Sequence, residues 1–190
     1  MDTMMIDDGI GLSEQCSREG VRVLTQLLAD QHVLVQKLRN YHWNVRGLQF
    51  AELHALFERQ YELLGKRIDE VAERIRQLGH PAPATLTEFL QLTTLAEYPG
   101  DYPNANAMLG NILEDHESLI RRVRRELTAE DHCGLDDGTI DLLVDLMRDH
   151  EKMAWMLRAT LSVAGDRTVR AKAEPAHAHH TEYFEYHSAG

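Results

Sequence analysis

The sequence predicts an all-α fold, a bundle of four long helices with a short helix in the crossover between the second and third. Apolar residues recur every three or four positions along four long segments, which is the pattern of helices that bury one face. The sequence between the second and third of these segments, residues 79–103, lacks this pattern over most of its length. A connection this long argues against simple up-and-down neighbours joined by tight turns.

Capping and breaking residues set the expected limits of the first two helices. Ser13 or Ser17 can cap a first helix that runs to about Trp43. Gly47 ends the connection that follows, and the second helix is expected to run to Leu78. The Gly-His-Pro-Ala-Pro sequence directly after it stops that helix.

The remaining helices are predicted from similar signals. Thr85 and Glu88 fit a capping box, so a short helix is expected over about 86–92. The third long helix is expected over about 104–128 and the fourth over about 139–164. Four long helices with one long crossover are the arrangement of a ferritin-like four-helix bundle.

The chain of 190 residues suits one folded domain. We expect the bundle to occupy residues 13–165, between a flexible N-terminal segment, residues 1–12, and a His-rich C-terminal tail, residues 166–190. The tail loses the helical periodicity, and its low apolar content does not offset the entropy of ordering it alone.

Composition excludes several classes of protein. Hydrophobic residues make up 43% of the chain, and no apolar run approaches the ~20 residues of a membrane span. The N-terminus lacks the basic start and apolar core of a signal peptide. Cys16 and Cys133 are isolated, which favours a reducing, cytoplasmic location. The net charge of −11 opposes non-specific attraction to nucleic acid and suits cation uptake.

Ionisable side chains share one face of the second expected helix, namely His54, Glu58, Asp69 and Glu73. At about 100° per residue, they fall within about 100° of one another around the axis, on a face that overlaps the apolar one. Ionisable groups are rarely buried without a partner. A metal ion is the leading candidate for that partner, and His42 on the first helix can supply a fifth ligand.

The spacing along the helix restricts how these side chains can meet. The pair His54 and Glu58 and the pair Asp69 and Glu73 are centred at positions 56 and 71, about 22 Å apart at ~1.5 Å per residue. Either each pair serves a separate site, or two copies of the helix pack antiparallel about a two-fold axis. In the second arrangement the first pair of one chain meets the second pair of the other, and two equivalent sites result.

The chemistry of these ligands points to a catalytic metal site. Imidazole combined with carboxylates suits iron or manganese rather than a thiolate-loving metal. Five such side chains do not fill all the coordination positions of a metal centre with more than one ion, so positions stay open for water, oxygen or peroxide, which is typical of a catalytic site rather than a closed structural one.

The strings HWNVRG, LH three residues after Phe50, and IDEVAERIRQLG resemble the Dps family, the mini-ferritins known as DNA-binding proteins from starved cells. The resemblance covers roughly residues 15–165. It implies a di-iron ferroxidase centre between two subunits, with two irons per site. Carried over by position, the ligands are His42, His54, Glu58, Asp69 and Glu73, and Glu58 stands where many relatives have Asp.

The resemblance also implies a function. In this family a homo-oligomer, a hollow cage of twelve subunits built from two-fold dimers, takes up iron(II). The iron is oxidised, usually by hydrogen peroxide, and stored as a ferric oxyhydroxide mineral, which protects against oxidative damage. Two electrons from two irons reduce one peroxide, so the hydroxyl radical of one-electron chemistry is avoided.

Two other functions are alternatives. A nucleoid-associated protein that compacts DNA is disfavoured, because residues 1–20 carry five acids and one base and the tail carries four acids and three bases. A buffer for other transition metals is the third, through a secondary site formed by tail histidines, His177, His179 and His180.

Three further features bear on function. Trp43, next to a ligand position, is either a packing residue or an aromatic that absorbs stray oxidising equivalents. Acids recur every four residues at the start of the fourth helix, and the resemblance implies that Asp141 and Asp145 line an acidic ion pore at a three-fold axis. The other helical histidines are interpreted as ordinary helix residues, and the arginines of residues 121–125 as a solvated face paired with acids.

Overall fold

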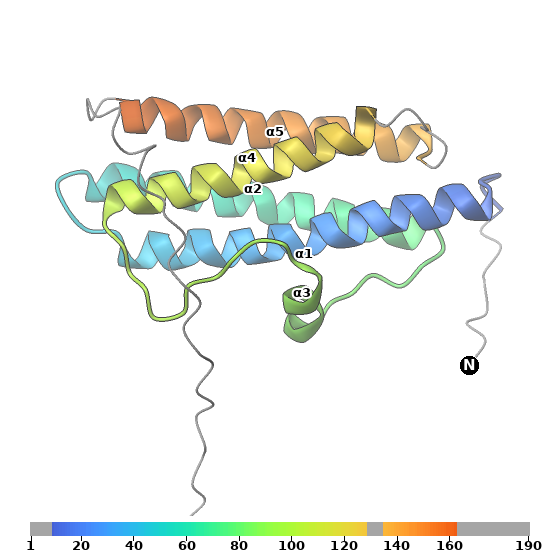
Figure 1. The fold of residues 1–190 in the computed structure, drawn as a ribbon, viewed down its shortest axis with the longest axis horizontal. Coiled ribbons are helices and arrows are strands. Elements are labelled where there is room, and N and C mark those ends of the chain that lie inside the picture. The colour runs from blue at the N-terminus through green and yellow to red at the C-terminus, as the bar shows by residue number, and fades with distance from the viewer. Residues whose placement is uncertain (1–8, 129–134, 163–190) are drawn as a thin grey trace, which may run out of the picture.

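The structure, a computed structural model, describes residues 9–128 and 135–162 of the chain. Within those ranges all of the regular secondary structure is helical and there is no strand, so the predicted all-α fold is confirmed. The helices, shown in Figure 1, are α1 (Glu14–Asn44), α2 (Phe50–Gln77), α3 (Leu86–Leu92), α4 (Ala105–Thr128) and α5 (Asp137–Ser162).

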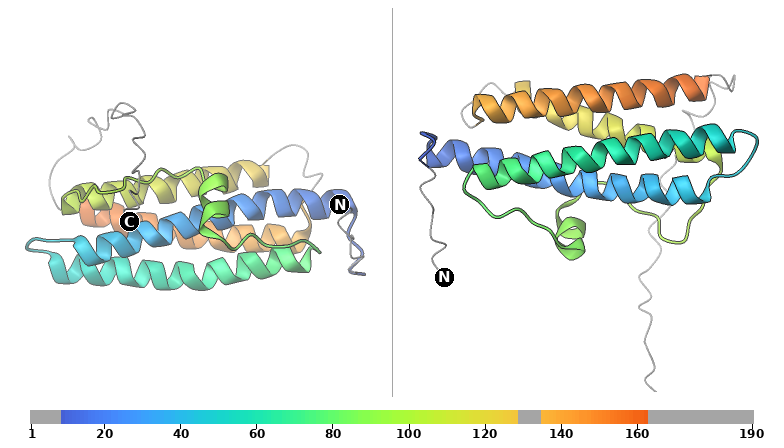
Figure 2. Two further views of the ribbon diagram at one scale, coloured as in Figure 1. Left: turned by 90° about the horizontal axis from the view of Figure 1, so that it is seen from below. Right: turned by 180° about the vertical axis from the view of Figure 1, so that it is seen from behind.

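The four long helices form two antiparallel hairpins packed side by side (Figures 1 and 2). α1 packs against α2 and α4, and α5 packs against α4 and α2. Because α2 and α4 run in the same direction, the crossover between them travels the length of the bundle (Figure 1). It carries α3, which packs on the outer side of α1. This is the ferritin-like arrangement that the long crossover predicted.

Side chains cap the helix starts that the sequence indicated. The Ser13 hydroxyl accepts a hydrogen bond from the Cys16 amide at 3.2 Å, so the first of the two candidate caps begins α1. Thr85 and Glu88 form the predicted capping box of α3. α5 begins at Asp137, slightly earlier than expected, because Asp136 caps it by accepting hydrogen bonds from the Gly138 and Thr139 amides.

One apolar core runs through the bundle. The inner faces of the four long helices contribute fully buried side chains to it, so this core forms only when the helices dock against one another. None of the helices in the described ranges is long and apolar enough to cross a membrane. Fully buried contributors to the core include Leu24, Leu34, Leu38, Phe57, Leu64, Ile75, Leu109, Ile112, Leu143 and Leu157.

Buried charges fasten the crossover to the bundle. Asp30 on α1 is fully buried and accepts hydrogen bonds from the Thr93 hydroxyl at 2.8 Å and the Thr94 amide at 2.6 Å. Arg122 on α4 forms an ion pair with the same carboxylate. Because a buried charge without partners is strongly destabilising, these contacts tie α1, the crossover and α4 together at one point.

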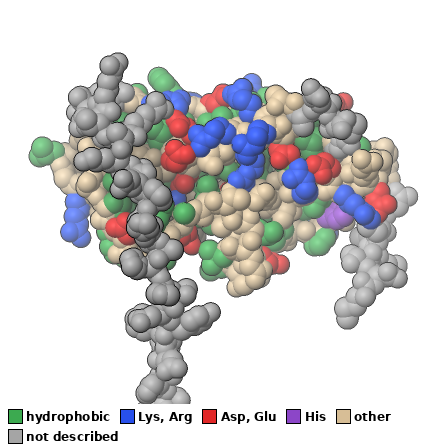
Figure 3. Space-filling view, viewed as in Figure 1, with side chains coloured by type: hydrophobic (Ala, Val, Ile, Leu, Met, Phe, Trp, Pro, Cys, Tyr) green, Lys and Arg blue, Asp and Glu red, His purple; other side chains and the backbone are tan. Residues whose placement is uncertain are grey.

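Basic and acidic side chains lie next to one another on the face seen in Figure 3. On α4, Arg121 pairs with Glu114 at 2.7 Å, and Arg124 pairs with Glu151 of α5. With Arg122 bound to Asp30, three of the four arginines between residues 121 and 125 have acidic partners. This part of the surface is therefore mostly self-neutralised, which the sequence pattern indicated.

Candidate metal centre

His42 and His54 lie together where α1 ends and α2 begins. The connection between these helices turns at Gly47, whose φ of +117° is a backbone conformation that favours glycine. The turn sets the two imidazole rings face to face, with their centroids 3.6 Å apart and their planes 19° from parallel. His42 is buried, at 7% exposure, and His54 is partly buried.

Each of these imidazoles is held by the backbone of the other residue. The Nδ1 atom of His42 lies 2.8 Å from the carbonyl oxygen of His54, and the Nδ1 atom of His54 lies 2.8 Å from the carbonyl oxygen of His42. A carbonyl oxygen can only accept, so each Nδ1 carries a proton. In the neutral rings the lone pair is therefore on Nε2, the form that binds a metal ion. Neither Nε2 atom has a hydrogen-bond partner in the described part of the chain.

Aromatic rings and an arginine surround this histidine pair. Phe50 stacks on His54 with 5.1 Å between ring centroids, and the edge of Tyr61 meets His42 at 5.4 Å. The guanidinium of Arg39 lies 5.4 Å above the Tyr61 ring. These contacts fix the orientation of the imidazoles from both sides, so the pair is preorganised before any ligand arrives.

Tyr61 links the histidine pair to Glu58. Its hydroxyl donates a hydrogen bond to Glu58 Oε1 at 3.3 Å, and it lies one helical turn beyond that carboxylate on α2. Desolvation, and then the charge of Glu58, raise the pKa of the Tyr61 hydroxyl, so it stays protonated as a donor near neutral pH. In the sequence Tyr61 falls at helical spacing from Phe57 and Leu64, so it reads as part of the apolar stripe, and that pattern gives no sign of a role for its hydroxyl.

Asp69 and Glu73 lie elsewhere in the same chain. Both are exposed on α2, several turns beyond His54 and about 22 Å from the centre of the first pair along the helix axis. Neither has a hydrogen bond or ion pair to any described residue, whereas the neighbouring Glu70 pairs with Arg67 at 2.6 Å. Among the described residues, one chain forms no cluster of three or more His, Cys, Asp or Glu side chains that can hold a metal.

Comparison with known proteins assigns the family. Residues 21–164 match the ferritin-like domain family. The chain is 44% identical over 150 residues to an uncharacterized low temperature-induced protein of Nostoc sp., covering 79% of this chain and 84% of that protein. It is 36% identical over 147 residues to the DNA protection during starvation protein 2 of Bacillus anthracis, covering 77% and 99%. The chain belongs to the Dps family of ferritin-like proteins.

A solved Dps structure supports this membership in three dimensions. The Dps protein of Vibrio cholerae O1, described as a member of a broad superfamily of ferritin-like diiron-carboxylate proteins, superposes with a TM-score of 0.74 and 34% identity. The match covers 80% of this chain and 94% of that one. The Dps fold therefore extends over nearly the whole described part of this chain.

Acids recur every four residues on α5, at Asp137, Asp141, Asp145 and Asp149, and we call them the acidic stripe. Ion pairs neutralise part of this stripe in the Dps chain. Asp141 is exposed on α5 and has no ion-pair partner among the described residues. Asp145, one turn further, pairs with Arg148. Asp149 pairs with Arg67 of α2 at 2.5 Å. Of the two residues expected to line an ion pore, only Asp141 presents an uncompensated charge.

Of the other expected sites, the structure describes Trp43 but not the tail histidines. Trp43 is 70% exposed and makes no ring contact with His42 or another described residue, so it does not stack on the histidine pair. His177, His179 and His180 lie outside the described residues, and the secondary metal site stays a prediction.

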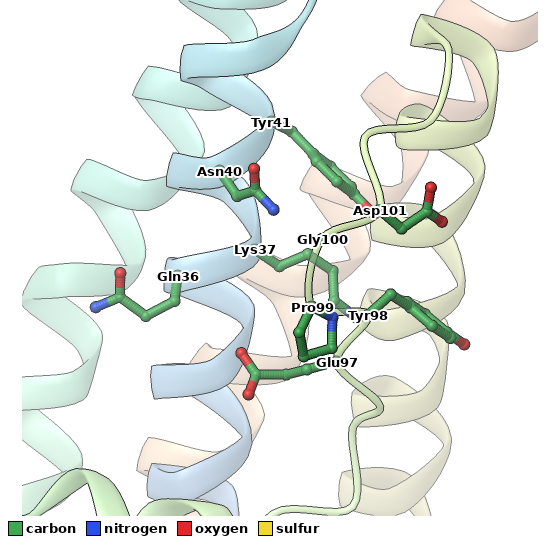
Figure 4. A pocket seen from close by; sticks show the side chains of 9 residues that line it. All are labelled: Gln36, Lys37, Asn40, Tyr41, Glu97, Tyr98, Pro99, Gly100 and Asp101. Carbon is green, nitrogen blue, oxygen red and sulfur yellow. The ribbon is translucent and has the colours of Figure 1, made fainter. Parts of the chain in front are cut away.

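A hollow of about 210 Å³ opens between α1 and the crossover (Figure 4). Tyr98, whose ring lies 5.9 Å from the Lys37 ammonium, covers one side of it, and that ammonium pairs with the buried Asp115 at 2.5 Å. Its lining includes two carboxylates and no histidine, so it does not provide a metal-ligand set. The lining residues are Gln36, Lys37, Asn40, Tyr41, Glu97, Tyr98, Pro99, Gly100 and Asp101.

The bundle interior holds a second histidine pair that the sequence pattern did not reveal. His116 of α4 and His150 of α5 are fully buried, and their Nδ1 atoms lie 2.8 Å apart. The interpretation of both as ordinary helix residues therefore overlooks their pairing. The signal available in the sequence is a polar residue on the apolar stripe of each helix, which places both side chains on inner faces.

Proposed function

We propose that the chain is a ferroxidase and iron-storage protein. It oxidises iron(II), with hydrogen peroxide as the expected oxidant, at di-iron centres shared between two chains, and stores ferric oxyhydroxide inside a hollow cage of twelve subunits. Its membership of the Dps family supports a role in iron storage and protection in general terms. The cytoplasmic location expected from the isolated cysteines remains part of this proposal.

One observation carries the proposal. The candidate metal ligands of a single chain fall into two incomplete sets. His42 of α1 and His54 of α2 lie together where the two helices meet, and the unpaired Asp69 and Glu73 lie several turns further along α2. Two copies of α2 that pack antiparallel, with the two-fold axis between Leu63 and Leu64, bring the first set of one chain to the second set of its partner. Such a dimer has two equivalent sites by symmetry.

The chemistry of this combined set suits iron oxidation. His42 and His54 offer neutral imidazole nitrogens, and Glu58, Asp69 and Glu73 offer three negative charges that offset most of the charge of two iron(II) ions. Each iron gives up one electron, and one hydrogen peroxide accepts both and, with two protons, becomes two waters. The three carboxylates favour the more highly charged iron(III) product, since added positive charge strengthens their attraction.

Direct DNA binding and buffering of other metals are not part of the proposal. The arginine-rich segment of α4 is occupied by ion pairs, and the net charge of −11 repels phosphate. A gel shift at low salt checks this, since strong binding that weakens steeply with salt would instead favour a nucleoid protein.

The test is the double variant His54→Ala with Asp69→Ala. It removes one ligand from each set, and we expect fast iron(II) oxidation with hydrogen peroxide to be lost while the oligomer still forms. His80→Ala with Asp101→Ala is the matched control, because it changes the same residue types outside the four long helices. Normal oxidation kinetics in the first variant would disprove the site.

A further inference from the structure

Four polar side chains, one from each long helix, come together in the interior of the bundle. Gln31 of α1, Gln60 of α2, His116 of α4 and His150 of α5 are 0–3% exposed. The Nδ1 atoms of the two histidines lie 2.8 Å apart. Gln31 Nε2 lies 3.4 Å from His150 Nε2, and His116 Nε2 lies 3.4 Å from Gln60 Oε1. We call these four residues the core polar layer.

The protons of the core polar layer can be assigned from these contacts. The Gln31 amide nitrogen donates to His150 Nε2, so the His150 proton is on Nδ1 and is donated to His116 Nδ1. The His116 proton is then on Nε2 and is donated to Gln60 Oε1. This chain of hydrogen bonds leaves Gln31 Oε1 and Gln60 Nε2, both buried, with no partner among the described residues. An unsatisfied buried polar atom costs roughly 1–3 kcal/mol, so a ligand that satisfies one is favoured.

Both histidines of the layer are neutral at physiological pH. Desolvation by burial lowers the pKa of His116 well below its ordinary value and that of His150 to about 4. Two neutral imidazoles that face each other through Nδ1 form a ligand pair once the proton between them moves away.

We propose that the core polar layer binds one monovalent soft metal ion, copper(I), between His116 Nδ1 and His150 Nδ1. The ion takes the position of the shared proton, and that proton moves from His150 Nδ1 to His150 Nε2. Rotation of the Gln31 amide then places its orphaned Oε1 to accept from His150 Nε2, while His116 Nε2 keeps donating to Gln60 Oε1. Each ligand histidine thus donates its other N–H to a carbonyl oxygen, the arrangement that orients metal-bound imidazoles.

The charge of the layer selects the kind of ion. None of its four side chains is anionic, and the next carboxylate on α5, Asp149, is already paired with Arg67. A buried divalent ion would keep two uncompensated charges, whereas a monovalent ion keeps one. Copper binds imidazole well, and separating the two nitrogens by about 1 Å accommodates two bonds of ~2.0 Å on opposite sides of the ion. No proton is lost, because the tautomer change only relocates one.

This site is separate from the proposed iron centre. His42 and His54 lie at the end of the bundle and need a second chain, whereas the core polar layer lies inside one chain. Loss of iron oxidation in the His54 and Asp69 variant therefore leaves the copper site unaffected, and the two proposals can fail independently.

Silver(I), a redox-silent substitute for copper(I), provides the direct test on the full-length assembled protein. Crystals soaked with silver(I) are expected to show anomalous density between the two Nδ1 atoms of the core polar layer. Density only at other histidines, or only a water in the layer, would overturn the proposal.

Titration in solution is the second measurement. His150→Gln and His116→Gln are each expected to bind one silver(I) per chain fewer than the wild type, while His32→Gln, a helical histidine outside the layer that stacks on Phe89, binds the same number. The tail histidines are present in every variant, so any silver(I) that they bind does not change the difference in stoichiometry between variant and wild type. Calorimetry in two buffers should detect no proton release for that one ion at pH 7.

A variant outside the ligands keeps the proposal testable if the histidine variants fail to assemble. Gln31→Leu removes the oxygen that accepts from His150 Nε2 and is expected to weaken this silver site by roughly 10- to 100-fold. Unchanged affinity in Gln31→Leu, or equal silver stoichiometry in wild type and His150→Gln, would contradict the assignment.

Discussion

His42 and His54 each donate from Nδ1 to the backbone carbonyl oxygen of the other, at 2.8 Å in both directions. The two residues are twelve positions apart and belong to different helices, so this exchange holds the end of α1 against the start of α2. It also leaves Nε2 of each neutral ring available to a metal ion. The connection between the helices and the candidate metal ligands are thus one structural unit.

The proposed intersubunit arrangement predicts complementation between two inactive variants. His54→Ala chains and Asp69→Ala chains, unfolded and reassembled together, form mixed dimers in which one of two sites keeps all of its ligands. A one-to-one mixture should recover about a quarter of the wild-type sites, because about half of the dimers are mixed. Stopped-flow measurement of iron(II) oxidation checks this. No recovery above the two separate variants would indicate that the ligands do not come from two chains.

Tyr61→Phe isolates the role of the tyrosine hydroxyl. The ring contacts with His42 and Arg39 remain, and only the hydrogen bond to Glu58 is lost. We expect iron(II) affinity to fall by roughly tenfold, since partners that orient a ligand carboxylate matter to that extent, and stability to fall by about 1 kcal/mol or less. Calorimetric titration measures the affinity. Tyr102→Phe, an exposed tyrosine, is the control and should behave as wild type.

The neutral histidines of the core polar layer predict a loss of stability in acid. Histidine in the unfolded chain takes up a proton below its ordinary pKa of 6.5, whereas the pKa of folded His150 is about 4. Between these values protons bind the unfolded chain preferentially, so lowering the pH through this window destabilises the folded state. His150 alone contributes about 2 kcal/mol of that loss at pH 5, and His116 adds to it.

Urea unfolding at pH 7.5 and pH 5, at fixed protein concentration, measures this effect. His150→Gln should have a smaller difference between the two pH values than the wild type, whatever its stability at pH 7.5. Parallel pH dependence of the two proteins would show that His150 is not neutral and buried in the folded state.

The acidic stripe of α5 predicts opposite effects from two substitutions. Asp141→Asn with Asp145→Asn removes negative charge and should slow iron uptake at low iron(II) and low salt, without changing the oxidation centre. Arg148→Gln removes the ion-pair partner of Asp145 and should speed uptake. Mineral growth followed by absorbance measures both. Equal rates in all three proteins would exclude a role for the stripe in attracting iron.

Local signals in the sequence determined the helices and their ends. The apolar periodicity, Gly47, the Thr85 and Glu88 capping box and the predicted helix of residues 86–92 all appear in the structure, because each depends on residues only a few positions apart. The spacing of the five candidate ligands is also a property of the sequence. That spacing by itself excludes a single site along α2, since one ion cannot span about 22 Å.

Only the tertiary structure decided which polar residues of different helices meet. His116 and His150 are 34 positions apart, and Gln31 is more than 80 positions from either. Helical periodicity predicts the face on which such a residue lies, but the axial register between helices comes from how their apolar side chains pack. That register brought the core polar layer together. The distance of Asp69 and Glu73 from His54 has a different cause, which is the length of the one rigid helix that carries all three residues.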